Sequence, residues 1–289
     1  MTAPIPDGLR LAAIALLAAT INGALGYGFS SITVPVALLF LTSRVLNPAL
    51  VLVEVAINVY VLAANWRSAR PAFRRTWTIL LGLIPGIASG SAVLARVHPD
   101  HVRLITYLVL LPLILLQAAG LRRPVRSERA IGPPFGVGVG LLYSVTTISG
   151  PPLAVLLNNQ GLAKQEFRAA LALVRTAESS ITAAAYLLLG LYKPGSLALL
   201  PFIVPAVLIG VPLGAGLINR IDTEMFRRLC MSFDAWIVGF GLSRVLPRVR
   251  LAPDAEAYLV FAGVIVLDLM LLYRFFARRG ARASPIYRL

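Results

Sequence analysis

The sequence has few of the residues that build most catalytic and metal-binding sites. It contains one cysteine, Cys230, and two histidines, His98 and His101, among 289 residues. A lone cysteine excludes an intrachain disulfide, a cysteine metal cluster and a thiol relay, because each of these needs a partner thiol. The histidines flank a short polar stretch with Asp100, which is more typical of a solvated turn than of a metal site. We therefore expect no metal and no other cofactor.

Charged residues are also scarce. They make up 13% of the chain, whereas 58% of its residues are hydrophobic. Soluble domains carry about twice that charged fraction. Several apolar runs approach the roughly 20 residues that a helix needs to cross a bilayer. This composition predicts an all-α, polytopic membrane protein with the lipid bilayer as a partner.

Acidic residues are fewer than basic ones, 12 against 27, and the formal net charge is +15. Such an excess can indicate nucleic-acid binding. Here, however, the basic residues stand at the ends of apolar runs, where the positive-inside rule places them. We therefore expect no nucleic-acid partner. Most of them lie on the side of the loops at Trp66 and Arg122, which predicts an outside N-terminus and a cytoplasmic C-terminus in a bacterial inner membrane.

The chain is predicted to form a single membrane domain over residues 1–289. Almost no positive charge precedes the first apolar segment and no convincing cleavage site ends it, so we expect this segment to be retained. The apolar segments lie at about 9–26, 29–43, 48–65, 77–95, 102–120, 131–145, 148–160, 168–190, 195–218, 225–243 and 257–275.

An internal repeat divides the chain into two halves. SSITVP (Ser30–Pro35) aligns with TTISGP (Thr146–Pro151), and ALVLVEVAIN (Ala49–Asn58) aligns with ALALVRTAES (Ala170–Ser179). We predict one repeat over about 9–120, a second over about 131–246, and an extra C-terminal transmembrane helix over about 257–275. An odd number of segments per half inverts the second repeat, provided that the short first pair forms a re-entrant hairpin. An even number leaves the repeats parallel.

The aligned motifs are polar and rich in glycine and proline, at a depth where an apolar helix would otherwise continue. Irregular backbone at membrane depth must be buried in protein or line a wet cavity. Interrupted helices in inverted repeats form the substrate sites of secondary transporters, and a helix N-terminus with free amides attracts anions. Thr147 and Ser149 can cap the following helix or donate to a ligand. Ordinary kinks packed between helices are the alternative. The candidate substrate-binding residues are Gly28, Ser30, Ser31, Thr33, Thr146, Thr147, Ser149 and Gly150.

Ionisable residues inside apolar segments are costly and are functional candidates for that reason. Glu54 and Arg175 occupy equivalent positions in the two halves, so they can approach each other near a pseudo-two-fold axis. Arg175 can instead bind the anion through its guanidinium fork. Glu54 or Glu178 can carry a coupled proton or gate the path. A structural ion pair that fixes helix register is the alternative for Glu54 and Arg175.

The motifs GALGYGFSSITVPVALLF and GLLYSVTTISGPPLAVLL, each followed by an Ala-Leu-x-Leu-Val helix, resemble those of the TauE/SafE sulfite exporter family of small-anion permeases. The resemblance covers nearly the whole chain. It departs from the commoner glycine-rich first motif at Tyr27 and Phe29. It implies that the solute is sulfite, a sulfonate or a related organic acid.

We therefore predict a secondary transporter of a small sulfur oxyanion that works by alternating access, with a proton as the candidate driving ion. A passive anion channel, an intramembrane enzyme and a scaffold subunit are the alternatives. An enzyme needs a clustered catalytic set at one depth, and neither histidine lies in an apolar segment. We therefore expect no enzymatic activity. The sequence leaves open whether the chain forms a homo-oligomer.

Overall fold

The computed structural model describes residues 5–25, 28–119, 128–158, 164–217 and 223–283. All regular secondary structure in these ranges is helical, as the composition predicts. The first half comprises α1 (Ile5–Leu25), α2 (Phe29–Ala37), α3 (Ser43–Ala64), the 3-10 turn η1 (Trp66–Ser68), α4 (Ala69–Arg96) and α5 (Pro99–Ala118). The second half comprises α6 (Glu128–Thr146), α7 (Gly150–Asn158), α8 (Lys164–Leu188), α9 (Pro194–Leu197), α10 (Leu200–Leu217) and α11 (Thr223–Val245), and α12 (Asp254–Ala283) follows both.

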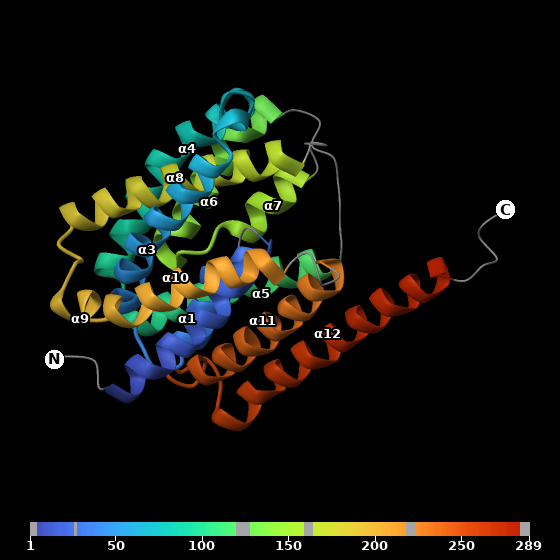
Figure 1. The fold of residues 1–289 in the computed structure, drawn as a ribbon. Helices are drawn as coiled ribbons and strands as arrows, with labels where there is room; N and C mark the ends of the chain where they lie inside the picture. Colours follow the sequence, from blue (N-terminus) through green and yellow to red (C-terminus); the bar gives the residue numbers. More distant parts are fainter. Residues whose placement is uncertain (1–4, 26–27, 120–127, 159–163, 218–222, 284–289) are drawn as a thin grey trace.

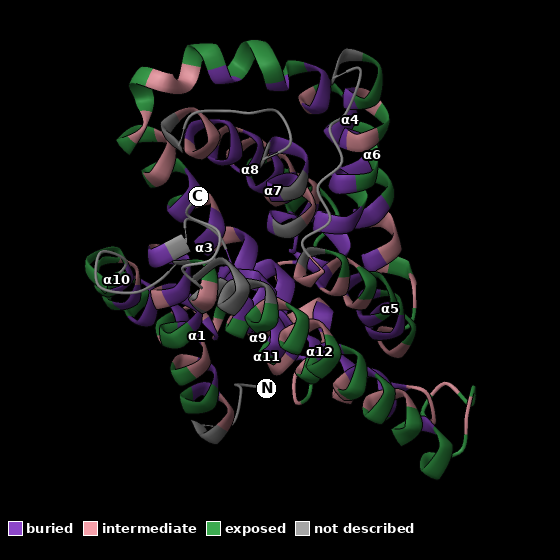
Figure 2. Ribbon diagram, turned by 90° about the vertical axis from the view of Figure 1, so that its right-hand side faces the viewer, coloured by how far each residue is buried: buried purple, intermediate pink, exposed green. Residues whose placement is uncertain are grey.

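The helices form two groups that draw members from both halves of the chain (Figure 1). One group contains α3, α4, α6, α7 and α8, and the other contains α1, α5, α10, α11 and α12. α12 is the outermost helix and packs mainly along α11. Buried residues gather where the two groups meet, whereas α12 is largely exposed (Figure 2). The described residues form separate hydrophobic clusters, and the two largest each combine residues from both halves of the chain.

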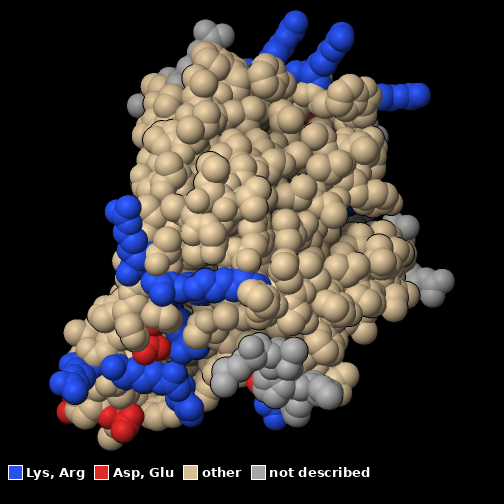
Figure 3. Space-filling view, turned by 90° about the vertical axis from the view of Figure 1, so that its left-hand side faces the viewer, with Lys and Arg blue, Asp and Glu red and all other residues tan. Residues whose placement is uncertain are grey.

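The outer surface suits a lipid environment. Six described helices are long and apolar enough to cross a membrane. Large apolar side chains project outward from several of them, including Leu188, Leu208, Leu259 and Tyr273. In the face drawn in Figure 3, a belt of uncharged surface separates two zones that carry Lys and Arg. Monomeric soluble proteins rarely expose so much contiguous apolar surface. The prediction of a multi-pass membrane protein is therefore confirmed.

The nine-residue helix of each half is too short to cross a bilayer. α2 and α7 have nine residues each, which corresponds to about 13 Å against a hydrocarbon core of about 30 Å. The predicted segments 29–43 and 148–160 thus contain shorter helices than expected. The predicted segment 195–218 is also divided, into α9 and α10.

Helix boundaries recur between the halves at the spacing that separates Glu54 from Arg175, which is 121 residues. The end of α1 and the starts of α2 and α3 recur in this register at α6, α7 and α8. The register sets Gly28 against Ser149 and Ser30 against Pro151. The alignment of Ser30–Pro35 with Thr146–Pro151 is therefore wrong, because two hydroxyl-rich stretches resemble each other without occupying equivalent positions. Inversion of the second repeat stays a prediction.

Glycines let two helix pairs approach closely, and each pair joins opposite halves. On α4, a Cβ added at Gly82 or Gly86 would collide with backbone oxygens of α6, at Pro133 and Val137 respectively. On α10, a Cβ added at Gly214 would collide with the Thr20 carbonyl oxygen of α1. Membrane helices associate through such small residues because apolar burial gains nothing over contact with lipid tails. The α4–α6 and α1–α10 contacts therefore hold the two halves together.

Two glycines on α6 provide a test of this packing. A Cβ at Gly136 would meet the Ile79 carbonyl oxygen, whereas a Cβ at Gly138 meets nothing within 4 Å. We expect Gly136→Ala to destabilise the protein by roughly 1–3 kcal/mol through overpacking. Gly138→Ala should be neutral or stabilise it by up to about 1 kcal/mol, since alanine favours helix. Thermal unfolding of both variants in detergent measures the difference, and equal shifts would contradict the packing argument.

Candidate functional site

Each half contains a break in the helical backbone just before its nine-residue helix. Gly28 precedes α2 with φ 111°, a left-handed value that favours glycine. Thr147 follows α6 with φ 57°, which is strained for a β-branched residue. Strain of this kind persists only where the surrounding contacts impose it. Both breaks are therefore held by the packed structure around them.

The side chain of Thr146 hydrogen-bonds to backbone groups on both sides of the second break. Its hydroxyl donates to the Leu142 carbonyl oxygen at 2.7 Å and accepts from the Ile148 amide at 3.1 Å. The Thr147 hydroxyl donates to the Thr146 carbonyl oxygen at 2.7 Å. These two candidate hydroxyls are thus hydrogen-bonded to backbone groups in this arrangement, and their role in ligand binding stays a prediction.

The hydroxyls of the first motif lie inside α2 rather than before it. Ser30 and Ser31 fall in its first turn, and Thr33 and Pro35 lie further along the same helix. The sequence motif had suggested a polar run ahead of the helix. Instead the chain becomes helical directly after Gly28, because Phe29 and Ile32 pack into the core and draw this turn inward. Thr33 is fully buried and its hydroxyl has no hydrogen-bond partner among the described residues.

Glu54, on α3, is the centre of a buried polar cluster. Its Oε1 accepts hydrogen bonds from the Ser30 hydroxyl at 2.7 Å and from Arg175 Nη2 at 2.8 Å. Its Oε2 accepts one from the Tyr143 hydroxyl at 2.7 Å. The Glu54 side chain is 1% exposed and that of Arg175 is 5% exposed. The expected approach of Glu54 and Arg175 is therefore confirmed as a buried, hydrogen-bonded ion pair.

Arg175, on α8, keeps donor capacity beyond this ion pair. Its Nε is buried and has no hydrogen-bond partner among the described residues. The backbone carbonyl of Arg175 accepts from the Ser179 hydroxyl at 2.8 Å and from Asn58 Nδ2 at 3.4 Å. Neighbouring polar groups thus position this turn of α8, while part of the guanidinium stays free to donate.

A second carboxyl group lies beside the first. Glu178 Oε2 accepts a hydrogen bond from the Ser149 hydroxyl at 2.6 Å. Its Oε1 is buried without a hydrogen-bond partner in the described part of the chain. Glu178 interacts electrostatically with both Glu54 and Arg175. The expected capping of α7 by the Ser149 side chain is thus replaced by a bond to Glu178.

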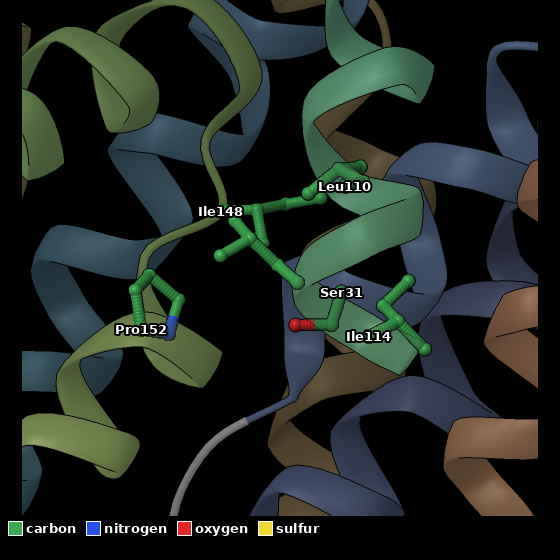
Figure 4. Close-up of a pocket in the computed structure, with 6 residues that line it drawn as sticks. Ser31, Leu110, Ile114, Ile148 and Pro152 are labelled. Carbon is green, nitrogen blue, oxygen red and sulfur yellow. The ribbon is translucent and has the colours of Figure 1, made fainter. Parts of the chain in front are cut away.

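Where the two motifs approach each other they enclose a small cavity (Figure 4). It has a volume of about 10 Å³, room for one water molecule, and is lined by Ser31, Leu110, Leu113, Ile114, Ile148 and Pro152. Ser31 comes from α2, Ile148 from the second break, and Pro152 from the first turn of α7. The Ser31 hydroxyl is the polar side-chain group in this lining. The structure therefore brings the two motifs together around one space, beside α5.

Other ionisable candidates lie elsewhere. Asp268, on α12, accepts hydrogen bonds from Arg228 at 2.8 Å and from Trp236 at 3.1 Å, which fastens α12 to α11. Asp234 is buried, and its Oδ1 has no partner among the described residues. Gly150 begins α7 as its first residue. No group of three or more His, Cys, Asp or Glu residues in the described ranges is arranged to hold a metal ion.

Tyr143 is the member of the cluster that sequence reasoning missed as a functional residue. It lies in the last turn of α6, is fully buried, and binds Glu54. A tyrosine in an apolar segment, directly ahead of the polar stretch of the second motif, was the available signal. Its partner lies 89 residues away in the chain, so the motif alone could not reveal the contact.

Comparison with known proteins agrees with this architecture. Residues 11–241 match the family model described as Sulfite exporter TauE/SafE. Both motifs, the Glu54 cluster and every helix from α2 to α10 fall within the matched range. No curated protein and no solved structure matches the chain. The chain therefore belongs to the TauE/SafE sulfite exporter family, a family of membrane transporters, not enzymes, for sulfur-containing anions.

Proposed function

We propose that this protein is a secondary transporter that moves a small sulfur oxyanion by alternating access around the Glu54 cluster. The observation that carries the proposal is the set of three donors on one buried carboxylate. Ser30, Tyr143 and Arg175 converge on Glu54 from three different helices. When a small oxyanion leaves water, hydrogen-bond donors of the same kind, hydroxyl groups and a guanidinium, must replace its hydration.

In this proposal the Glu54 carboxylate holds the place of the transported anion. The donors cannot serve both groups at once, because two negative charges at that distance repel strongly in a low-dielectric interior. A proton on Glu54 removes the competing charge and releases the donors. The anion then binds Arg175, Ser30 and Tyr143, and it leaves when Glu54 loses its proton.

The charges of the cluster support coupling to protons. Two carboxyl groups, Glu54 and Glu178, face one guanidinium, Arg175. With both carboxyl groups ionised the cluster is negative, and adding an anion would bury still more unbalanced negative charge. Uptake of a proton together with the anion avoids this. The proposed mechanism is therefore proton–anion cotransport.

The cavity at Ser31 is the proposed route between the cluster and the solvent. The cavity is lined by residues of both motifs. Ser31 lies next to Ser30 in the first turn of α2, and Ser30 binds Glu54. In the described state the cluster itself is closed, since Glu54 and Glu178 are fully buried. A movement of α2 or α7 would connect the two.

The place-holder role of Glu54 can be tested with methanesulfonate, which keeps one negative charge across the working pH range. A ligand of the native state raises thermal stability by mass action. We expect methanesulfonate to stabilise Glu54→Gln more than the wild-type protein, because the substitution removes the charge that competes for the donors. Glu178→Gln is the matched control, and a gain in stabilisation that appears in it but not in Glu54→Gln would reverse the assignment.

The donor set can be tested with a pair of tyrosines. Tyr143 donates to Glu54, whereas Tyr186, equally buried, donates to the Ser144 carbonyl oxygen. Tyr143→Phe should weaken methanesulfonate binding about tenfold, the effect of losing one hydrogen bond to a charged group. Tyr186→Phe should leave the affinity unchanged even if it lowers stability. Titration calorimetry measures both, and equal affinities in the two variants would remove Tyr143 from the site.

The proposed orientation has the N-terminus outside and the C-terminus in the cytoplasm of a bacterial inner membrane. Single cysteines placed on a Cys230→Ala background report it. Arg67→Cys, in η1, should be shielded from an impermeant maleimide added to whole cells. Arg250→Cys, in the turn before α12, should react, since Arg250 is exposed. The opposite labelling pattern would invert the topology.

A further inference from the structure

A second basic site lies apart from the Glu54 cluster, between α5 and α11. It is an open pocket of about 120 Å³ beside the end of α2. Three arginines line it, together with one tyrosine and a set of apolar groups: Arg103, Arg244 and Arg248, with Tyr107, Leu38, Leu39, Phe240, Gly241 and Val245. The three arginines and Tyr107 lie outside the two sequence motifs, whereas Leu38 and Leu39 belong to the end of the first one.

Arg103 is built into the wall of the pocket. It is 7% exposed. Its Nη1 donates to Asp100 at 3.1 Å and its Nη2 donates to the Leu41 carbonyl oxygen at 2.5 Å. Its Nε is buried and has no hydrogen-bond partner among the described residues. A buried donor without a partner costs free energy, so this N–H is a position where a bound acceptor would stabilise the protein.

The other two arginines carry charge that the protein does not neutralise. Arg244 stacks over the Phe240 ring at 5.9 Å, and Arg248 lies one turn further along the chain. Both are exposed, and neither forms an ion pair in the described ranges. Asp100 offsets part of the charge of Arg103 alone. Three guanidinium groups against one carboxylate leave the pocket with a positive excess.

Tyr107 lines the pocket and is held in place by contacts with α11 and α2. A Cβ at Gly241 would collide with its ring, so the glycine on α11 is what lets α5 approach. The Tyr107 hydroxyl donates to the Pro35 carbonyl oxygen of α2 at 3.1 Å. The pocket is thus joined to the far end of the short helix that carries Ser30 and Ser31.

We propose that this pocket binds a second oxyanion, of sulfate, sulfonate or phosphate type, held by Arg103, Arg244 and Arg248. Planar guanidinium forks match tetrahedral oxyanions through paired hydrogen bonds. The site does not depend on the Glu54 cluster, and Arg244 and Arg248 lie outside the range that matches the family model. The ligand is either a free anion from solution or the phosphate of a lipid headgroup, because both present the same oxygens.

The test measures binding of radiolabelled sulfate by equilibrium dialysis, with the full chain in nanodiscs of zwitterionic phosphatidylcholine. Arg244→Gln with Arg248→Gln removes two exposed charges and leaves the buried wall intact. Arg67→Gln with Arg70→Gln, also exposed, is the matched control at a distant position. We expect the pocket variant to weaken sulfate binding at least about tenfold at this site, and the control to change nothing. Unchanged sulfate binding in the pocket variant, or equal losses in both, would overturn the proposal.

Arg175→Gln separates the two sites. If it retains a sulfate equivalent that Arg244→Gln with Arg248→Gln removes, the pocket is an independent site. If Arg175→Gln changes nothing on a Glu54→Gln background, which lacks the competing carboxylate, while the pocket variant loses sulfate, the pocket stands and the function proposed for the Glu54 cluster fails. Nanodiscs with phosphatidylglycerol identify the source. Sulfate displaced from wild type by this anionic lipid indicates a headgroup site, and undiminished binding indicates a site for the free anion.

Discussion

One buried carboxylate connects four helices of the bundle. Glu54 on α3 binds Ser30 on α2, Tyr143 on α6 and Arg175 on α8. A charge at this depth is tolerated only when it is paired and hydrogen-bonded, so each of these side chains depends on the others. The position of α2 follows from this contact. With it follow the small cavity beside Ser31 and the placement of the arginine pocket at the other end of the helix.

The packing around this cluster is close in some places and sparse in others. α4 packs against α6, and α1 against α10, through glycines that bring backbones into contact. α4 also packs along α8. In the 121-residue register α10 corresponds to α4 and α3 corresponds to α8, but α10 makes few contacts with α3. Corresponding helices of the two halves are therefore packed unequally in this structure.

The two proposed anion sites lie at opposite ends of one nine-residue helix. Ser30 stands in the first turn of α2, and Leu38 follows its last residue. Such a helix is about 13 Å long. The arginine pocket contains two exposed arginines and one buried arginine, and these outnumber its single carboxylate. The inner cluster has more carboxyl groups than guanidiniums. In the two proposals an anion is therefore attracted to the pocket by uncompensated guanidinium charge, whereas the inner cluster accepts one only together with protons.

The amino-acid sequence by itself determined the membrane environment, the all-helical class and the importance of the two polar motifs. These follow from composition and from residues close together in the chain, because the bilayer demands long apolar helices and penalises polar interruptions. The equivalence of Glu54 and Arg175 also came from the sequence, and with it their contact. Tertiary structure decided what each hydroxyl does. Thr146 and Thr147 bind backbone, Ser30 and Ser149 bind carboxylates, and Tyr143 joins the cluster, since these partners are distant in sequence and hydrogen bonds are set within tenths of an ångström by packing. The arginine pocket was likewise decided by tertiary structure, because its residues become neighbours only when α5 and α11 meet at Gly241.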